Sequence, residues 1–455
     1  METDILIIGA GLTGLSAGVE LKKRSKDFMI LEKSERVGGQ IHSYSENGFL
    51  FESGPTTGSG ASDEVMEMFS DLESLCEVEF AKKKSEKRLI WKNGKFHALP
   101  SGLISAVTTP LFNFSDKIRI LGEPFRKKGN NPDESVASLT KRRLGKSFLA
   151  YAVDPFLSGI YAGNPETLVT RHALPKLYNL EQNYGSFIGG SIAKAKEAKK
   201  NPPKNAKKGI FSAKGGLESL PKAMAQYIGS EKIILSADNI TILPENGKWK
   251  ITYQKDGENV TIISNQLIST IGSYNLPQVF PFIEKEKMNN LTNAQYAPVI
   301  QVAVGMKDKM NLDFNAFGAL FSSKDKQDFL GILFPSSCFT NRSPEDGVLF
   351  SFFMGGMKRK DIFDWTDTQI TETVTAALHT HLGFPKETQP ALLRIFRHKY
   401  AIPQYEKSSD IRFETIRQLE TEYKGLHIAG NLRDGIGMAH RIIQGINLGK
   451  TIGSE

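Results

Sequence analysis

The sequence predicts an α/β fold with three parts: a Rossmann-type dinucleotide-binding domain, a sheet-based substrate domain and a helical insertion. Three observations predict it. The chain starts with a strand, a glycine-rich turn and a helix; its middle lacks strand alternation; and β-branched and aromatic segments return after about residue 300. A length of 455 residues is enough for two or three such domains.

The N-terminal residues predict a βαβ unit. Asp4–Ile8 is a run of branched residues typical of a buried strand, Leu12–Lys23 has the apolar spacing of a helix, and Phe28–Leu31 supplies the next strand. A unit of roughly 30 residues with this order has parallel strands. We therefore expect a parallel sheet at the start of the chain.

The turn between the first strand and the helix has the pattern Gly-x-Gly-x-x-Gly. Gly9 allows a tight turn, Gly11 lets the backbone approach a pyrophosphate, and Gly14 allows close packing of helix and strand. The free N–H groups of the helix N-terminus attract phosphate. Glu32, at the end of the second strand, suits ribose hydroxyls and disfavours the 2′-phosphate of NADP. Together these residues predict a dinucleotide site.

Further elements follow from local patterns. Residues 100–200 lack strand alternation and predict a helical insertion. Later segments predict an antiparallel meander, one strand after it, and the strands of a second sheet. In that order they are Lys232–Leu235, Ile240–Leu243, Trp249–Tyr253 and Val260–Ile263; Gln266–Thr270; and Val299–Val304, Phe329–Leu333 and Val348–Phe353.

Two segments of the insertion allow more than one interpretation. The apolar residues between Leu103 and Phe114 have mixed spacing, so they form either a packed helix face, which we favour, or a surface that meets lipid. The basic run Lys194–Lys208 contains two prolines and lacks aromatic residues that stack on bases, which favours a solvated loop. A net charge of +8 would suit nucleic acid, an anionic membrane or an acidic small molecule, and we expect no nucleic acid.

The cysteines and the N-terminus indicate the compartment. Cys76 and Cys338 lie far apart, outside any metal-binding pattern, so neither disulfides nor a metal site is expected. No stretch approaches the ~18 apolar residues that span a membrane. Acidic residues precede the first apolar run, the reverse of a signal peptide. We expect a cytoplasmic protein, free or peripheral on the cytoplasmic face of a membrane.

Residues 32–40 resemble the second signature of the flavin amine oxidase superfamily, in which an acid is followed by Arg-x-Gly-Gly. Phe51–Thr56, Lys214–Pro221 and Ile428–Met438 resemble three further segments of it. The resemblance implies an FAD-binding domain of the amine-oxidase (GR2) type, with FAD as the cofactor. The implied cofactor-binding residues are Gly9, Ala10, Gly11, Leu12, Thr13, Gly14, Glu32, Lys33, Arg36, Gly39, Gln40, Gly54, Pro55, Thr56, Thr57, Ile240, Gly430, Ile436, Gly437 and Met438.

Four internal blocks resemble the oxygen-dependent, FAD-containing protoporphyrinogen oxidases and the related coproporphyrinogen oxidases. The blocks are residues 154–165, residues 174–186, residues 333–344 with Gly355-Gly356, and residues 402–405. The closing motif departs from many members at Met438-Ala439-His440. The resemblance covers nearly the whole chain.

This resemblance implies a reaction in haem biosynthesis. Protoporphyrinogen IX would lose six electrons in three rounds through FAD, with dioxygen as acceptor and hydrogen peroxide as product, and a further enzyme of the pathway would receive the porphyrin. Coproporphyrinogen III is the alternative substrate. A flavin amine oxidase, a carotenoid desaturase and a flavin-free binding protein are the other classes.

The resemblance also implies two substrate-site residues and a domain division. Arg88 matches the basic residue that pairs with a substrate propionate, for which a guanidinium is well suited, and the alternative is a surface arginine. Gly159 matches the catalytic position whose carbonyl faces the pyrrole N–H groups and whose missing side chain leaves room for the macrocycle; the alternative is a plain turn glycine. The predicted domains are 1–85 with 210–272 and 425–455 for FAD, 86–98 with 273–424 for substrate, and 99–209 as a helical, membrane-facing insertion.

Overall fold

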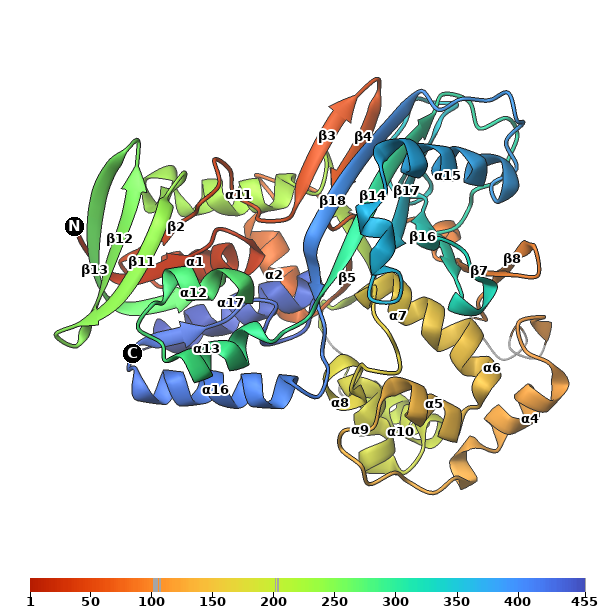
Figure 1. The fold of residues 1–455 in the computed structure, drawn as a ribbon, viewed down its shortest axis with the longest axis horizontal. Helices are drawn as coiled ribbons and strands as arrows, with labels where there is room; N and C mark the ends of the chain where they lie inside the picture. The colour runs from red at the N-terminus through yellow and green to blue at the C-terminus, as the bar shows by residue number, and fades with distance from the viewer. Residues whose placement is uncertain (101–104, 106–107, 201, 203, 455) are drawn as a thin grey trace.

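The computed structural model describes all residues except 101–104, 106, 107, 201, 203 and 455. Two large sheets lie side by side, and a group of helices lies below the second of them in Figure 1. The predicted α/β class is confirmed.

The first sheet contains the N-terminal βαβ unit. Its strand order is β10-β2-β1-β13-β12-β11, and β19 pairs with β13. The predicted elements β1 (Glu2–Ile8), α1 (Leu12–Lys23) and β2 (Phe28–Leu31) form as expected, with β1 and β2 parallel. The other strands are β10 (Ile233–Ile234), β11 (Asp238–Glu245), β12 (Lys248–Lys255), β13 (Glu258–Ser269) and β19 (Leu426–Ile428).

The predicted meander is correct for three strands and wrong in two details. Val260–Ile263 and Gln266–Thr270 belong to one strand, β13, which pairs antiparallel with β12 and parallel with β1 and β19. Lys232–Leu235 contributes only the short β10, which pairs parallel with β2 outside the meander. The change of partner along β13 therefore joins the meander and the βαβ unit into one sheet.

Helices cover both faces of the first sheet. On one face lie α1, α2 (Asp63–Asp71), α11 (Ser219–Ile228) and α17 (Met438–Ile452), which share a core with β1 and β2. On the other lie α12 (Leu276–Val279), α13 (Lys285–Thr292) and α16 (Ser409–Glu422). Because both faces are covered, β1 reads as a continuous apolar run rather than an alternating one.

The second sheet has the order β18-β14-β17-β16-β15-β7-β8. One face packs on α15 (Asp367–Thr380), and β4 (Phe49–Ser53) and α7 (Asp154–Tyr161) also pack against the sheet. The three predicted strands form within β14, β16 and β17. The bounds are β7 (Arg88–Lys92), β8 (Lys95–Ala98), β14 (Tyr296–Met306), β15 (Gly318–Phe321), β16 (Phe329–Leu333), β17 (Val348–Gly355) and β18 (Leu392–Pro403), with α14 (Pro335–Cys338) between β16 and β17.

The helical part, α4 to α10, forms the third group. Its helices are α4 (Phe114–Leu121), α5 (Val136–Arg143), α6 (Lys146–Phe148), α7 (Asp154–Tyr161), α8 (Thr170–Ala173), α9 (Pro175–Tyr184) and α10 (Phe187–Lys200), with a π-helical turn at Leu149–Val153. This agrees with the expected helical insertion. The predicted domain boundaries stay a prediction.

The basic run does not form the loop that we expected. Its first half, through Lys200, is the exposed end of α10, and Lys207 begins β9 (Lys207–Ala213). Alanine, lysine and glutamate have high helix propensity, and Pro202 cannot continue the helix. Strand β9 joins β5 (Gly58–Ala61) and β6 (Val78–Phe80) in a small sheet, and β3 (His42–Glu46) pairs with β4 (Phe49–Ser53).

The apolar segment before α4 divides into two kinds of residue. Leu103, Ile104 and Val107 lie outside the described residues. Leu111 and Phe112 are buried against Tyr151, as the packing interpretation predicts, whereas Phe114 is 78% exposed. Among the described residues, no helix is both long and apolar enough to cross a membrane.

Candidate functional site

The glycine turn lies at the carboxyl end of β1 and has the close approaches that its pattern predicts. A Cβ built on Gly14 would lie 2.0 Å from the Gly9 carbonyl oxygen, and Gly9 has a φ of +103°. Gly11 is the N-cap of α1 without a side-chain cap, and a Cβ there meets nothing within 4 Å. The N-terminus of α1 therefore has free N–H groups beside open space.

Glu32 and the Arg-x-Gly-Gly turn hold this region in place. The Glu32 carboxylate is buried and accepts hydrogen bonds from the backbone N–H groups of Ala10 and Ser34, at 2.7 and 2.9 Å. The Arg36 guanidinium donates to the carbonyls of Val37, Gly39 and Ile41. Arg36 therefore shapes its own turn while it keeps a positive charge next to the glycines.

A buried glutamine that the sequence did not reveal joins the second sheet to β4 and the loop after it. Gln301, on β14, accepts a hydrogen bond from the N–H of Gly54 at 2.7 Å and donates to the carbonyl of Glu52 at 3.0 Å and to Thr56 Oγ1 at 3.5 Å. It is fully buried, and it is the lone amide in the apolar strand Tyr296–Met306. That isolated polar side chain was the available signal.

The carboxylate of Glu52 lies beneath the same loop. It accepts hydrogen bonds from the hydroxyl of Ser43 and the N–H of Leu217. Burial raises the pKa of Glu52 to about 7, because the hydrogen bonds offset only part of the desolvation. This carboxyl therefore titrates near neutral pH.

The segment Gly430–Gly437, which we call the closing loop, is fixed by four hydrogen bonds to three side chains. Gln444 accepts from the N–H of Gly430 and donates to Asp434, Tyr405 donates to the carbonyl of Asn431, and Arg412 donates to the carbonyl of Leu432. The loop ends at Gly437, the N-cap of α17. The N-termini of α1 and α17 thus lie together, since Thr13 Oγ1 donates to the carbonyl of Arg441 at 3.2 Å.

The remaining predicted cofactor residues surround these groups. Ile240 is buried beside Ala237, whose N–H donates to the carbonyl of Glu32. Gln40 donates to the carbonyl of Tyr400, and a Cβ on Gly39 would lie 3.4 Å from the Cα of Gly11. Leu12, Thr13, Thr56 and Met438 are buried, Pro55, Thr57 and Ile436 are half-buried, and Lys33 is exposed.

These residues fit FAD. The uncapped N-terminus at Gly11 and the facing Gly39 leave backbone room for a pyrophosphate, and the carboxylate of Glu32 is the acceptor that ribose hydroxyls need. Buried donors without acceptors also lie here, at Arg441 Nε and Nη2. Within the described residues, no group of three or more His, Cys, Asp or Glu side chains could hold a metal ion.

Three of the internal blocks meet at the C-terminal end of α7. Gln404 donates to the carbonyl of Tyr161 at 2.9 Å, and the N–H of Met357, next to Gly356, donates to the carbonyl of Ala162 at 2.7 Å. Ala162 is left-handed with a φ of +45°, a strained conformation for a non-glycine residue. The blocks therefore hold one strained helix end in place.

Gly159 lies in the last turn of α7, so the interpretation as a plain turn glycine is wrong. A Cβ on Gly159 would lie 2.6 Å from Leu320 Cδ2, so its missing side chain lets α7 lie directly on β15. The resemblance implied that the missing side chain leaves space for the macrocycle, but the Leu320 side chain occupies that space. No hydrogen bond to the Gly159 carbonyl occurs within the described part of the chain, because it is among the last helical carbonyls.

Arg88 lies on the strand next to this position. It is exposed, pairs in register with Gly318 of β15, and places its guanidinium 5.8 Å from the ring centre of Phe317. Leu320, which contacts Gly159, is two residues from Gly318, or ~6.6 Å along the strand. Arg88 on β7 therefore lies beside β15, the strand on which α7 packs at Gly159, and Arg88 forms no ion pair with any described residue.

The comparisons with known proteins agree with this geometry. The family model for flavin-containing amine oxidoreductases matches residues 12–440. Protoporphyrinogen oxidase 2 of Arabidopsis thaliana is 29% identical over 97% of this chain and 92% of its own length, and human protoporphyrinogen oxidase is 27% identical over 96% and 95%.

A solved structure from Exiguobacterium sp. 255-15 shares the fold with a TM-score of 0.80 and 19% identity, and covers 99% of both chains. The family match, the shared fold and the site that fits FAD agree with one another. This chain belongs to the flavin-containing amine oxidoreductase family and is an FAD-dependent oxidoreductase.

Proposed function

We propose that this protein oxidises protoporphyrinogen IX to protoporphyrin IX, with dioxygen as the electron acceptor and hydrogen peroxide as the second product. The main support is the convergence of three internal blocks on the end of α7, which packs on β15 beside the strand that carries Arg88. The similarity to protoporphyrinogen oxidases along nearly the whole chain supports the same substrate.

Bound FAD supplies the hydride acceptor. The protein's part is to hold the macrocycle and its charges. The Gly159 carbonyl, which accepts no hydrogen bond from the described residues, would accept hydrogen bonds from pyrrole N–H groups, and Arg88 would bind a propionate bidentately. Gln301 and the Gly54–Thr57 segment would fix the cofactor loop against the second sheet. Contacts of this kind hold the bound substrate in a reactive orientation and so lower the entropic part of the activation barrier.

The direct test is turnover of the purified, FAD-loaded protein. Colourless protoporphyrinogen IX should become fluorescent while oxygen is consumed and peroxide accumulates. Coproporphyrinogen III in a parallel assay decides between the two porphyrinogens by their kcat/KM values. Absence of turnover with both would refute the proposal, while an amine or phytoene as the sole substrate would assign another class.

Arg88→Ala should weaken substrate binding more than it slows chemistry. Loss of a charge-assisted hydrogen bond costs roughly 1.5–3 kcal/mol, so KM should rise roughly tenfold to a hundredfold with a smaller change in kcat. Arg88→Lys should recover part of the loss, because an ammonium keeps the charge but not the bidentate geometry. An unchanged KM in steady-state assays would exclude Arg88 from the substrate site.

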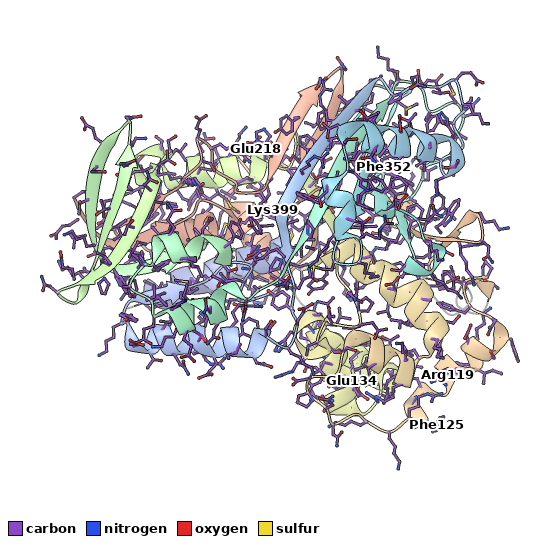
Figure 2. All side chains as sticks on the ribbon, in the orientation of Figure 1. Arg119, Phe125, Glu134, Glu218, Phe352 and Lys399 are labelled. Atoms are coloured by element: carbon purple, nitrogen blue, oxygen red, sulfur yellow. The ribbon has the colours of Figure 1, made fainter. Side chains whose placement is uncertain are left out.

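We also propose that the helical part binds an anionic membrane surface. Phe114, Ile118 and Leu121 repeat at helical spacing on α4, and Phe125 follows in the 3-10 turn Glu123–Phe125. These four residues, the apolar stripe, are 78%, 54%, 71% and 91% exposed. Figure 2 labels Phe125 at the lower edge of the helical part, and Arg119 lies on α4. Lys127 and Lys128 follow directly and are exposed, so positive charge borders the stripe. This combination suits an interfacial helix.

The double change Leu121→Asp and Phe125→Asp should reduce binding to vesicles that contain anionic phospholipid. Each buried apolar side chain contributes ~1.5–3 kcal/mol, so the loss should exceed roughly tenfold. Leu243→Asp is the control, since Leu243 is 43% exposed on β11, away from the helical part. Equal co-sedimentation of all three proteins would show that the stripe does not bind lipid.

A further inference from the structure

Arg441, in the first turn of α17, is a buried cation that forms no ion pair among the described residues, and the carboxylate of Asp434 acts on it only from a longer distance. Arg441 is only 8% exposed, and its Nη1 donates a hydrogen bond to Gln444 Oε1 at 2.6 Å. Nε and Nη2 are buried and have no hydrogen-bond acceptor, and Arg441 forms no ion pair with any described residue. Burial lowers the pKa of Arg441 to about 10, so the guanidinium still carries its charge at neutral pH.

A buried arginine in the helical part shows what is missing. Arg143 is 0% exposed, and it forms ion pairs with the carboxylates of Glu123 and Glu181. A buried charge that lacks such partners destabilises a folded protein strongly. A counter-charge for Arg441 should therefore come from a group that the polypeptide does not supply.

The position of Arg441 indicates which group this is. Its carbonyl accepts from Thr13 of the glycine motif, and its partner Gln444 also accepts from the N–H of Gly430. A Cβ on Gly445 would lie 2.4 Å from the Thr13 carbonyl oxygen, so α17 and α1 are in direct contact here. Arg441 thus lies among the segments that fit FAD, and the N-terminus of α17 adds positive potential.

We propose that Arg441 is the counter-ion of an anionic oxygen of FAD. Two parts of the cofactor have this chemistry: the pyrophosphate, and the pyrimidine ring of the isoalloxazine, which becomes anionic on reduction. In a site of low dielectric constant, a buried guanidinium stabilises such an oxygen over several ångströms. This contact involves only the cofactor, so it does not depend on which substrate the enzyme oxidises.

The test compares Arg441→Met and Arg441→Gln, which remove the charge, with Arg441→Lys, which keeps it. Arg417→Met is the matched control, because Arg417 is exposed on α16 and pairs with Glu414. Two properties of the FAD-loaded proteins are measured. One is the release of FAD on dilution, followed by free-flavin fluorescence; the other is the dissociation constant of sulfite, which adds to oxidised flavin, leaves an anionic ring and bleaches its visible absorbance.

Loss of the charge should weaken one of the two affinities roughly tenfold to a hundredfold, the range for a charge-assisted contact. Faster FAD release with normal sulfite affinity assigns the pyrophosphate, and weaker sulfite binding assigns the isoalloxazine. The Lys variant and the Arg417→Met control should stay within about threefold of the parent protein. Unchanged values in both charge-removing variants, or a Lys variant as impaired as the Met variant, would overturn the proposal.

Discussion

Gly14→Ala should give a protein that is purified without flavin and is markedly less stable. The new methyl carbon would lie 2.0 Å from the Gly9 carbonyl oxygen, and neither backbone can yield because α1 is enclosed by β1, α11 and α17. The clash should cost roughly 3 kcal/mol of unfolding free energy, the upper end of overpacking effects. The checks are the flavin-to-protein absorbance ratio and urea unfolding of the apoprotein.

Gly11→Ala separates the two functions of the glycine motif. Its backbone has a φ of −79°, which alanine adopts freely, and its Cβ would meet no protein atom within 4 Å. The apoprotein should therefore keep its stability within ~0.5 kcal/mol, while FAD binds more weakly because the methyl group occupies the approach of the pyrophosphate. Normal FAD affinity in Gly11→Ala would show that the cofactor does not approach this glycine, and a stable, yellow Gly14→Ala would show that the close packing is dispensable.

Local patterns were sufficient for much of the fold. Continuous runs of branched and apolar residues predicted β1 and β2, and the apolar residues after the glycine turn predicted α1, because these segments are buried on nearly all sides. Local patterns were not sufficient where the pairing of distant strands determines the length of a strand. Nothing local shows that β13 continues through Ser264 and Asn265, since its persistence depends on β1 and β12 on either side. The first half of the basic run forms a helix because its alanine, lysine and glutamate residues have high helix propensity, which outweighs the repulsion between its lysines.

The residues of the site also form two groups: those that a local pattern predicts and those that only the fold identifies. The glycine motif and Glu32 could be recognised because their chemistry depends on a fixed spacing within one segment. Gln301 and Arg441 could not, since each acts on residues more than 240 positions away: Gln301 on Glu52, and Arg441 on Thr13. A single polar residue in an apolar strand, or a basic residue one turn into a helix, has many structural explanations until its partners are known.

The second large effect is expected in the helical part, at Glu123. Its buried carboxylate accepts from the Arg143 guanidinium, the Ser186 hydroxyl and the N–H groups of Phe187 and Ile188. It therefore neutralises a buried cation and also satisfies the first N–H groups of α10, which would otherwise lack acceptors. Glu123→Ala removes both at once and should cost about 3–5 kcal/mol of unfolding free energy.

The pH dependence gives this prediction a second, independent measurement. Burial alone raises the pKa of Glu123, but its hydrogen-bond donors outweigh burial and hold the pKa below its ordinary value. A group whose folded-state pKa is lowered stabilises the protein above its unfolded pKa of ~4.3, and the contribution is lost as the pH falls through the folded value. Urea unfolding of the parent protein should therefore weaken below pH ~4, and Glu123→Ala should show a smaller dependence in that range.

Glu166→Ala is the control for Glu123→Ala, because it removes a carboxylate from an exposed ion pair instead of a buried one. Glu166 lies in the same part of the chain and pairs with Lys141, but both side chains are about half exposed, at 56% and 43%. Water screens such a pair, so its removal should cost no more than ~1 kcal/mol and leave the acid dependence unchanged. A similar cost for both variants would mean that Arg143 finds another acceptor, and that the start of α10 does not depend on Glu123.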